Sequence, residues 1–242
     1  MKVMITVTHL LGTGHLRRAL VLADAFSTAG HHVLLASGGM PLELPLPERT
    51  QMVQLPPLRS DGVNFARLLD DTDQPADDAL LARRQNLACK TLTDFAPDIL
   101  ITELFPFGRR ILSAEFEALL TTAHAQVPRP TILSSIRDIL APPSKPSKAA
   151  RAQDLINCRY DAVLVHSDPQ GTTLDKSWPV SDALLAKLRY TGYVTQPPPV
   201  PHPEAIGAGE ILVSAGGGSV GTDLFETAIA AARLMPEIRW RL

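Results

Sequence analysis

The segment 8–20, THLLGTGHLRRAL, holds the residues whose types and spacing most directly suggest chemistry. An apolar run is broken by Gly12, Thr13 and Gly14. Three basic residues, His15, Arg17 and Arg18, follow at once. Imidazole exchanges protons near neutral pH, and glycines between a strand and a helix let a ligand approach the backbone. The segment therefore indicates a phosphate-binding loop or a catalytic histidine, with a plain tight turn as the alternative.

His15 is expected near the amino end of a helix over residues 15–28. The positive end of the helix dipole favours a neutral imidazole, which can accept a proton from a hydroxyl group or water. The alternative is a histidine that only caps or packs the turn. Arg17 stands where the dinucleotide fingerprint requires its third glycine, so we do not expect NAD at this loop.

Polar side chains also lie at or just beyond the carboxyl ends of three later strand-like runs, 97–103, 129–135 and 161–167. They are Glu103, Arg109, Arg110, Ser135, Arg137, Asp138 and His166. Arginines near a helix start can clamp phosphate or carboxylate, and short polar groups can bind sugar hydroxyls. The alternatives are solvated arginines, a local arginine–aspartate pair and an ordinary turn.

A second glycine-rich loop, SAGGGSVG at 214–221, lies between an apolar run and a helical pattern. Gly216, Gly218 and Gly221 have the G-x-G-x-x-G spacing, which directs backbone N–H groups toward a phosphate at a helix start. Many phosphate ligands are bound in this way. The spacing therefore does not separate a dinucleotide from a mononucleotide.

The composition describes an ordinary globular protein, with 45% hydrophobic residues, 20% charged residues and a net charge of −2 over 242 residues. Such a charge predicts no general attraction to nucleic acid or to an anionic membrane. The two cysteines match no metal-ligand spacing. No secretory signal or membrane span of ~20 apolar residues is recognisable, so we expect a cytoplasmic protein.

The elements that must position these residues alternate between apolar β-type runs and helical periodicity. The predicted strands cover 2–10, 31–39, 50–55, 97–103, 129–135, 161–167 and 190–194. The predicted helices cover 15–28, 76–95, 108–125, 147–158 and 180–188. This alternation predicts an α/β fold with a doubly wound parallel sheet, in which ligands bind at the carboxyl ends of the strands.

Proline content divides the chain. We expect a Rossmann-like first domain over 1–194, a stiff proline-rich linker over 195–209 and the start of a second Rossmann-like domain over 210–242. The last segment has a strand–helix–strand pattern but is too short to bury a core of its own. We therefore expect a truncated second domain; the alternative is a tail that packs on the first domain.

The segments LLGTGHLRRA, TELFPFGRR, SSIRDIL, VHSDP, YTGYV and VSAGGGSVG together resemble bacterial predicted glycosyltransferases of GT-B type, related to glycosyltransferase family 28. That family includes the N-acetylglucosaminyltransferase that completes the lipid-linked peptidoglycan precursor. The resemblance covers nearly the whole chain. It implies an acceptor-binding first domain, a second domain that binds a nucleotide-sugar donor, usually UDP-linked, and transfer in the cleft between them without a metal or other cofactor.

The resemblance implies roles for His15 and for the second glycine loop, whereas the acceptor-side contacts are predicted from their position at the strand ends. His15 would help to deprotonate an acceptor hydroxyl, and Glu103 is the second predicted catalytic residue. The predicted substrate contacts are Gly12, Thr13, Gly14, Arg17, Arg18, Arg109, Arg110, Ser135, Arg137, Asp138 and His166. The predicted donor-phosphate contacts are Ser214, Gly216, Gly217, Gly218 and Ser219. A lipid-linked acceptor would bring the protein to a membrane surface.

This sequence departs from the peptidoglycan enzyme, which has a longer glycine run before its histidine, so the acceptor is not carried over. Gly12, Gly14, His15 and Arg18 also resemble a related nucleotide-sugar hydrolase of nonulosonic-acid synthesis, whose loop histidine activates water. A nucleotide-sugar hydrolase or epimerase is therefore one alternative. A non-catalytic acceptor-binding half that needs a partner is another.

Overall fold

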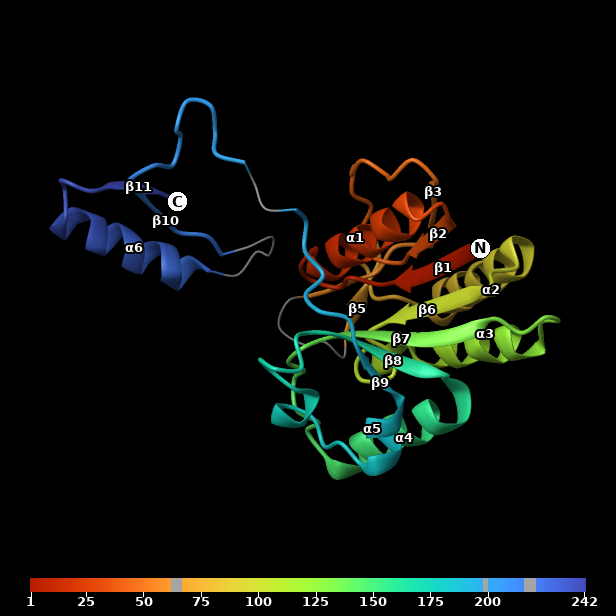
Figure 1. The fold of residues 1–242 in the computed structure, drawn as a ribbon. Helices are drawn as coiled ribbons and strands as arrows, with labels where there is room; N and C mark the ends of the chain where they lie inside the picture. Colours follow the sequence, from red (N-terminus) through yellow and green to blue (C-terminus); the bar gives the residue numbers. More distant parts are fainter. Residues whose placement is uncertain (62–66, 198–199, 216–220) are drawn as a thin grey trace.

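The computed structural model describes residues 1–61, 67–197, 200–215 and 221–242. Seven strands build its main sheet: β1 (Lys2–Val7), β2 (His32–Ser37), β3 (Thr50–Gln54), β6 (Ile99–Glu103), β7 (Thr131–Arg137), β8 (Ala162–His166) and β9 (Leu188–Tyr190). Their order in the sheet is β3-β2-β1-β6-β7-β8-β9, and every neighbouring pair is parallel (Figure 1). The predicted doubly wound parallel sheet is confirmed.

Helices follow most of these strands and cover both faces of the sheet. They are α1 (Gly14–Thr28), α2 (Asp78–Phe95), α3 (Ser113–Ala125), α4 (Pro146–Arg159) and α5 (Asp182–Lys187). Two 3-10 turns, η1 (Arg110–Leu112) and η2 (Leu174–Lys176), and a short antiparallel pair, β4 (Arg59–Ser60) with β5 (Leu68–Leu69), complete this part.

The alternation of side chains along β1 shows why both faces are buried. Val3 and Ile5 pack with Leu16 of α1 in one apolar cluster, whereas Met4 points into a second cluster that includes Phe116 of α3. Successive residues of a strand face opposite sides, so a run that is apolar throughout requires helices on both sides. The helices in turn fix where the loops at the strand ends lie.

The order of the strands reverses at β1. The chain proceeds outward from β1 to β2 and β3, and then returns to β6 on the other side of β1. In open parallel sheets the loops that leave the two adjacent strands at such a reversal run in opposite directions. Ligands bind in the crevice between these loops, at the carboxyl ends of the strands. The two predicted catalytic residues adjoin these loops: His15 is at the start of α1, and Glu103 is at the end of β6.

Several predicted elements are longer than the observed ones. The first two strands end at Val7 and Ser37, before the polar residues and glycines that the predicted runs included. The helix predicted from residue 108 begins at Ser113, after the 3-10 turn. Arg109 has a left-handed backbone with φ 57°, which an α-helix does not permit, so the helix cannot include Arg109 or begin before it.

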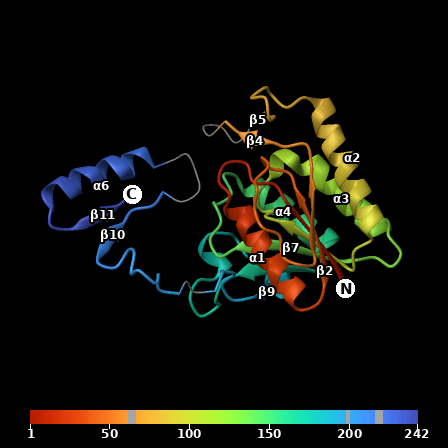
Figure 2. The same ribbon diagram turned by 90° about the horizontal axis from the view of Figure 1, so that it is seen from above.

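The last part of the described chain forms a separate small unit. Strands β10 (Glu210–Leu212) and β11 (Arg239–Arg241) are parallel and are joined through α6 (Thr222–Leu234). In Figures 1 and 2 this blue unit lies apart from the main sheet. Its side chains are widely exposed, including Leu212 at 70% and Leu234 at 84%. No helix within the described residues has the length and apolar character to cross a bilayer.

Candidate active site at the reversal of strand order

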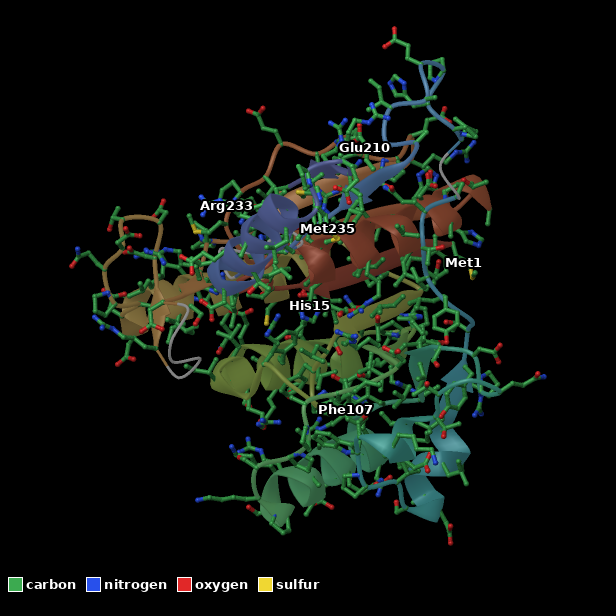
Figure 3. All side chains as sticks on the ribbon, turned by 90° about the vertical axis from the view of Figure 1, so that its left-hand side faces the viewer. Met1, His15, Phe107, Glu210, Arg233 and Met235 are labelled. Atoms are coloured by element: carbon green, nitrogen blue, oxygen red, sulfur yellow. The ribbon has the colours of Figure 1, made fainter. Side chains whose placement is uncertain are left out.

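His15 is the second residue of α1, directly beyond the carboxyl end of β1. Glu103 is the last residue of β6, the strand paired with β1. Figure 3 looks onto this edge of the sheet and shows His15 near its middle. The reversal of strand order thus brings together two residues that are 88 positions apart in the sequence.

The Glu103 carboxylate is the centre of the site. The side chain is only 2% exposed, and its Oε1 lies 2.9 Å from His15 Nδ1 and also accepts a hydrogen bond from the Arg18 guanidinium. Its Oε2 accepts a hydrogen bond of 2.7 Å from the Ser135 hydroxyl. Three donors from two elements, α1 and β7, therefore converge on one buried carboxylate.

The electrostatics keep this carboxylate ionised. Burial by itself would raise the pKa of Glu103, but the hydrogen bond from His15 and the charge of Arg18 outweigh it and lower the pKa below its usual value. Arg18 Nη2 lies 3.3 Å from His15 Nδ1, but it makes its shorter contact with Glu103 Oε1. An ionised carboxylate only accepts hydrogen bonds, so the 2.9 Å contact with Glu103 places the proton of a neutral His15 on Nδ1. Its Nε2 then has a free lone pair.

His15 Nε2 is available for a ligand. No group of the described chain hydrogen-bonds this atom, and the His15 side chain is 28% exposed. The neighbouring Gly12 and Gly14 face open space, because a Cβ at either position would meet no atom within 4 Å. The loop beside His15 is therefore open at both glycines, and the contact with Glu103 fixes the orientation of the imidazole.

Behind Glu103 the hydrogen bonds continue across the sheet. Ser135 Oγ lies 2.9 Å from His166 Nε2, and His166 Nδ1 lies 2.8 Å from Thr191 Oγ1. Ser135 is fully buried and His166 is 4% exposed. Burial, with a smaller contribution from the nearby Arg18 charge, lowers the pKa of His166 to about 4, so its imidazole is neutral at pH 7.

Arg109 lies at the same edge. Its Nε donates a hydrogen bond of 2.6 Å to the backbone carbonyl of Thr8, and burial lowers the pKa of its guanidinium. Within the described residues it forms no ion pair. The two Nη groups of this arginine are therefore free to meet an anion.

The remaining predicted substrate contacts do not join this network. Arg110 donates to the Phe107 carbonyl, and Arg137 pairs with Asp138 at 3.3 Å, the local pair that the sequence left open. Arg17 is exposed and donates to the Thr13 hydroxyl at 3.3 Å. Ser214 follows β10, whereas Gly216, Gly217, Gly218 and Ser219 lie outside the described residues.

Arg84 and Glu115 were missed by the sequence analysis. Arg84 on α2 is completely buried, and its Nε and Nη2 donate to the two oxygens of Glu115 on α3 at 2.9 and 3.1 Å. Its other N–H groups reach the Thr8 hydroxyl and the carbonyls of Gly38 and Pro56. This single arginine therefore ties together the loops that leave β1, β2 and β3.

A signal for Arg84 is present in the sequence. Leu80, Ala88 and Leu92 precede and follow it at four-residue intervals, so Arg84 falls on the apolar face of its helix. An arginine in such a place needs buried acceptors. Gly38, whose carbonyl accepts from Arg84, has no room for a side chain, because a Cβ there would overlap the Thr8 hydroxyl and the Arg84 guanidinium.

Two hollows lie beside the His15 site. One of about 900 Å³ follows the outer side of α1, between residues 44–47 and 195–197, and a smaller one of about 370 Å³ includes Gly14 and Arg18. Arg17 lines both. In the part of the chain that the structure describes, no three histidine, cysteine or acidic side chains converge as metal ligands would.

Comparisons with known proteins identify the fold. No family model and no curated protein matches the sequence. Among solved structures the chain is similar to apo UGT2 of Phytolacca americana, with 13% identity, a TM-score of 0.52, and coverage of 99% of this chain and 63% of that chain. It is also similar to MurG of Acinetobacter baumannii, with 16% identity, a TM-score of 0.48, and coverage of 98% and 58%.

A third similar structure is a glycosyltransferase from Rickettsia africae, with 13% identity, a TM-score of 0.46, and coverage of 78% of this chain and 42% of that chain. The chain thus spans about half the length of these solved structures. At such low identity the likeness concerns the fold alone. The expectation from sequence is confirmed at that level, and the chain has the α/β fold of the GT-B glycosyltransferases.

Proposed function

We propose that this chain catalyses glycosyl transfer, with residues 1–194 on the acceptor side and His15 as the general base. The observation that carries the proposal is the orientation of His15: Nδ1 faces the Glu103 carboxylate at 2.9 Å, and Nε2 is unpartnered in the described chain. A base held by a carboxylate on one side and open on the other is the arrangement that activates hydroxyl groups in many enzymes.

In the proposed reaction, His15 Nε2 takes the proton of an acceptor hydroxyl as its oxygen bonds to the anomeric carbon of a nucleotide sugar. The bond between that carbon and the diphosphate oxygen breaks, and the nucleoside diphosphate leaves with the electron pair. The imidazolium formed is stabilised by Glu103. Attack opposite the leaving group inverts the anomeric configuration.

The proposed substrate contacts are distributed over two segments. Arg109, with free Nη groups next to the site, would hold an anionic or hydroxyl group of the acceptor. The glycine loop at 214–221 and the start of α6 would bind the donor phosphates, because N–H groups at a helix start attract anions. A donor linked to UDP and a second domain beginning at residue 210 belong to this proposal.

The test measures release of UDP from a panel of UDP-sugars by the 242-residue chain, alone and with pooled sugar, phenol and lipid-alcohol acceptors. We expect acceptor-dependent UDP release and a glycosylated product by mass spectrometry. His15→Ala should lower the rate by about 100-fold to 10,000-fold, the usual contribution of a general base. His32→Ala is the control, because His32 is an exposed residue at the opposite end of the sheet.

Three results would contradict the proposal. Undiminished UDP release by His15→Ala would exclude His15 as the base. Free sugar as the sole product at the full rate would favour a nucleotide-sugar hydrolase. Acceptor binding without turnover of any donor would favour the non-catalytic half that needs a partner.

A further inference from the structure

We propose that Ser135 and His166 are positioning residues, which orient the Glu103 carboxylate so that His15 carries its proton on Nδ1 and presents Nε2 to the substrate. The inference rests on the proposed function for its role in catalysis. It differs from the substrate contact that the sequence predicted for these two residues, because both side chains are buried behind Glu103.

The register of the sheet places the three side chains in a row. Glu103 on β6 is the partner of Ser135 on β7, and Arg137, two residues further along β7, is the partner of His166 on β8. Parallel strands carry their carboxyl ends to one edge. Glu103, Ser135 and His166 therefore meet at that edge, although each comes from a different strand.

Only one arrangement of protons satisfies the contacts that join Glu103, Ser135, His166 and Thr191, and in it the Thr191 hydroxyl donates to His166 and not to the Gly192 carbonyl 3.1 Å away. The ionised Glu103 accepts, so the Ser135 hydroxyl must donate to Oε2. The Ser135 oxygen then accepts from His166 Nε2–H over 2.9 Å. His166 Nδ1 is left without a proton and accepts from the Thr191 hydroxyl at 2.8 Å. Every hydrogen bond in the row thus points toward Glu103.

The direction of these bonds has a consequence for His15. Ser135 occupies Oε2, which leaves Oε1 to His15 Nδ1–H and to Arg18. Without the Ser135 donor, the carboxylate can rotate, and Arg18 alone can satisfy it. Nδ1–H and Nε2–H forms of His15 then compete. The outer hydrogen-bond partners of metal-binding histidines fix tautomer and orientation in this way, and their loss costs about 10-fold to 100-fold in affinity or activity. We expect a cost of the same order here.

The experiment reads the tautomers of His15 and His166 from ¹⁵N NMR spectra of the labelled 242-residue chain at pH 7. We expect Nδ1–H at His15 and Nε2–H at His166 in the wild type. Ser135→Ala and His166→Asn should both increase the Nε2–H form of His15. His166→Gln should retain the wild-type tautomer, because the glutamine amide nitrogen takes the place of Nε2, whereas that of asparagine takes the place of Nδ1.

Ser134→Ala is the matched control. Ser134 is the neighbouring residue on β7 and is equally buried, but its hydroxyl donates to the Phe105 carbonyl at 2.8 Å instead of to Glu103. This variant should leave the His15 tautomer unchanged. Thermal unfolding of all four variants identifies effects that arise from a general loss of structure.

The inference is overturned if Ser135→Ala and His166→Asn keep the wild-type tautomer at His15. It is equally overturned if all four variants shift it in proportion to their loss of thermal stability, or if wild-type His15 is the Nε2–H form. The NMR readout needs no substrate, so it is independent of the proposed function. Where turnover is measurable, Ser135→Ala should lower kcat about tenfold at unchanged KM.

Should His15→Ala release UDP at the wild-type rate while the tautomers respond as expected, the proposed function fails and the positioning of His15 by Ser135 and His166 stands. Should the tautomers not respond while His15→Ala loses activity, the proposed function stands and the positioning role fails.

Discussion

Among the described residues, two buried carboxylates at the same edge of one sheet each pair with an arginine, Glu115 with Arg84 and Glu103 with Arg18, and the two sites differ in how completely they are enclosed. All five N–H groups of Arg84 have protein acceptors, and neither Arg84 nor Glu115 is open to solvent. Glu103 is also buried, but its carboxylate contacts the His15 imidazole, which is partly exposed.

This difference distinguishes a structural role from a role in the proposed reaction. A charge whose hydrogen bonds are all made inside the protein can only hold loops together, because nothing remains for a ligand. A carboxylate that contacts one nitrogen of a partly exposed imidazole can stabilise the imidazolium that forms when the other nitrogen takes a proton from a substrate. We therefore expect the Arg84–Glu115 pair to contribute to stability, whereas the proposed function gives the reactive role to His15 and Glu103.

The largest effect is expected from Arg84→Met. The substitution leaves the Glu115 carboxylate buried without its partner, and breaking such a pair costs about 3–5 kcal/mol in the free energy of unfolding. Urea denaturation measures this loss. Arg151→Met is the control: it removes an exposed ion pair with Glu117 and should change little. Equal losses of unfolding free energy in the two variants would show that the buried Arg84–Glu115 pair contributes no more to stability than an exposed ion pair.

The next effect concerns pH. The folded-state pKa of His166, about 4, lies below that of an unfolded histidine, so the unfolded chain binds more protons between these values. His166 therefore stabilises the fold above about pH 6.5, and this contribution, up to about 3 kcal/mol, is lost as the pH falls toward 4. The measurement compares unfolding free energies of the wild type and His166→Gln from pH 7 to 4.5. A constant difference between them would contradict the prediction.

A smaller effect separates two kinds of glycine. A Cβ at Gly39 would overlap the backbone carbonyl and imidazole of His9, so Gly39→Ala should lower the unfolding free energy by about 1–3 kcal/mol. Gly12 faces open space, and Gly12→Ala should change it by less than about 0.5 kcal/mol. If the substrate binds in the open space next to Gly12, Gly12→Ala should also raise KM.

The smallest change in stability is expected for His15→Ala. Arg18 and Ser135 still donate to the Glu103 carboxylate in this variant, so the unfolding free energy should fall by no more than about 1 kcal/mol. Its large loss of turnover would then mark a residue that serves the reaction and not the fold. A loss of stability as large as that of Arg84→Met would show that both pairs are scaffold.

The sequence predicted the fold class well because local patterns carry it. Apolar β-type runs that alternate with helical periodicity are sufficient to indicate a doubly wound sheet, and His15 and Glu103 stand out as polar residues after such runs. Arg84 shows the limit of this reasoning. Its position on the apolar face of a helix is visible, but its acceptors come from Thr8, Gly38 and Pro56, which are distant in the sequence.

The sequence by itself determined which residues follow each strand, and therefore that polar groups gather at one edge of a parallel sheet. Only the tertiary structure decided which of them touch. The order β2-β1-β6-β7-β8 sets Glu103 between His15 and Ser135, and the register of β7 with β8 adds His166. The physical reason is that strand order and register depend on how the helices pack on both faces, and no local pattern encodes them.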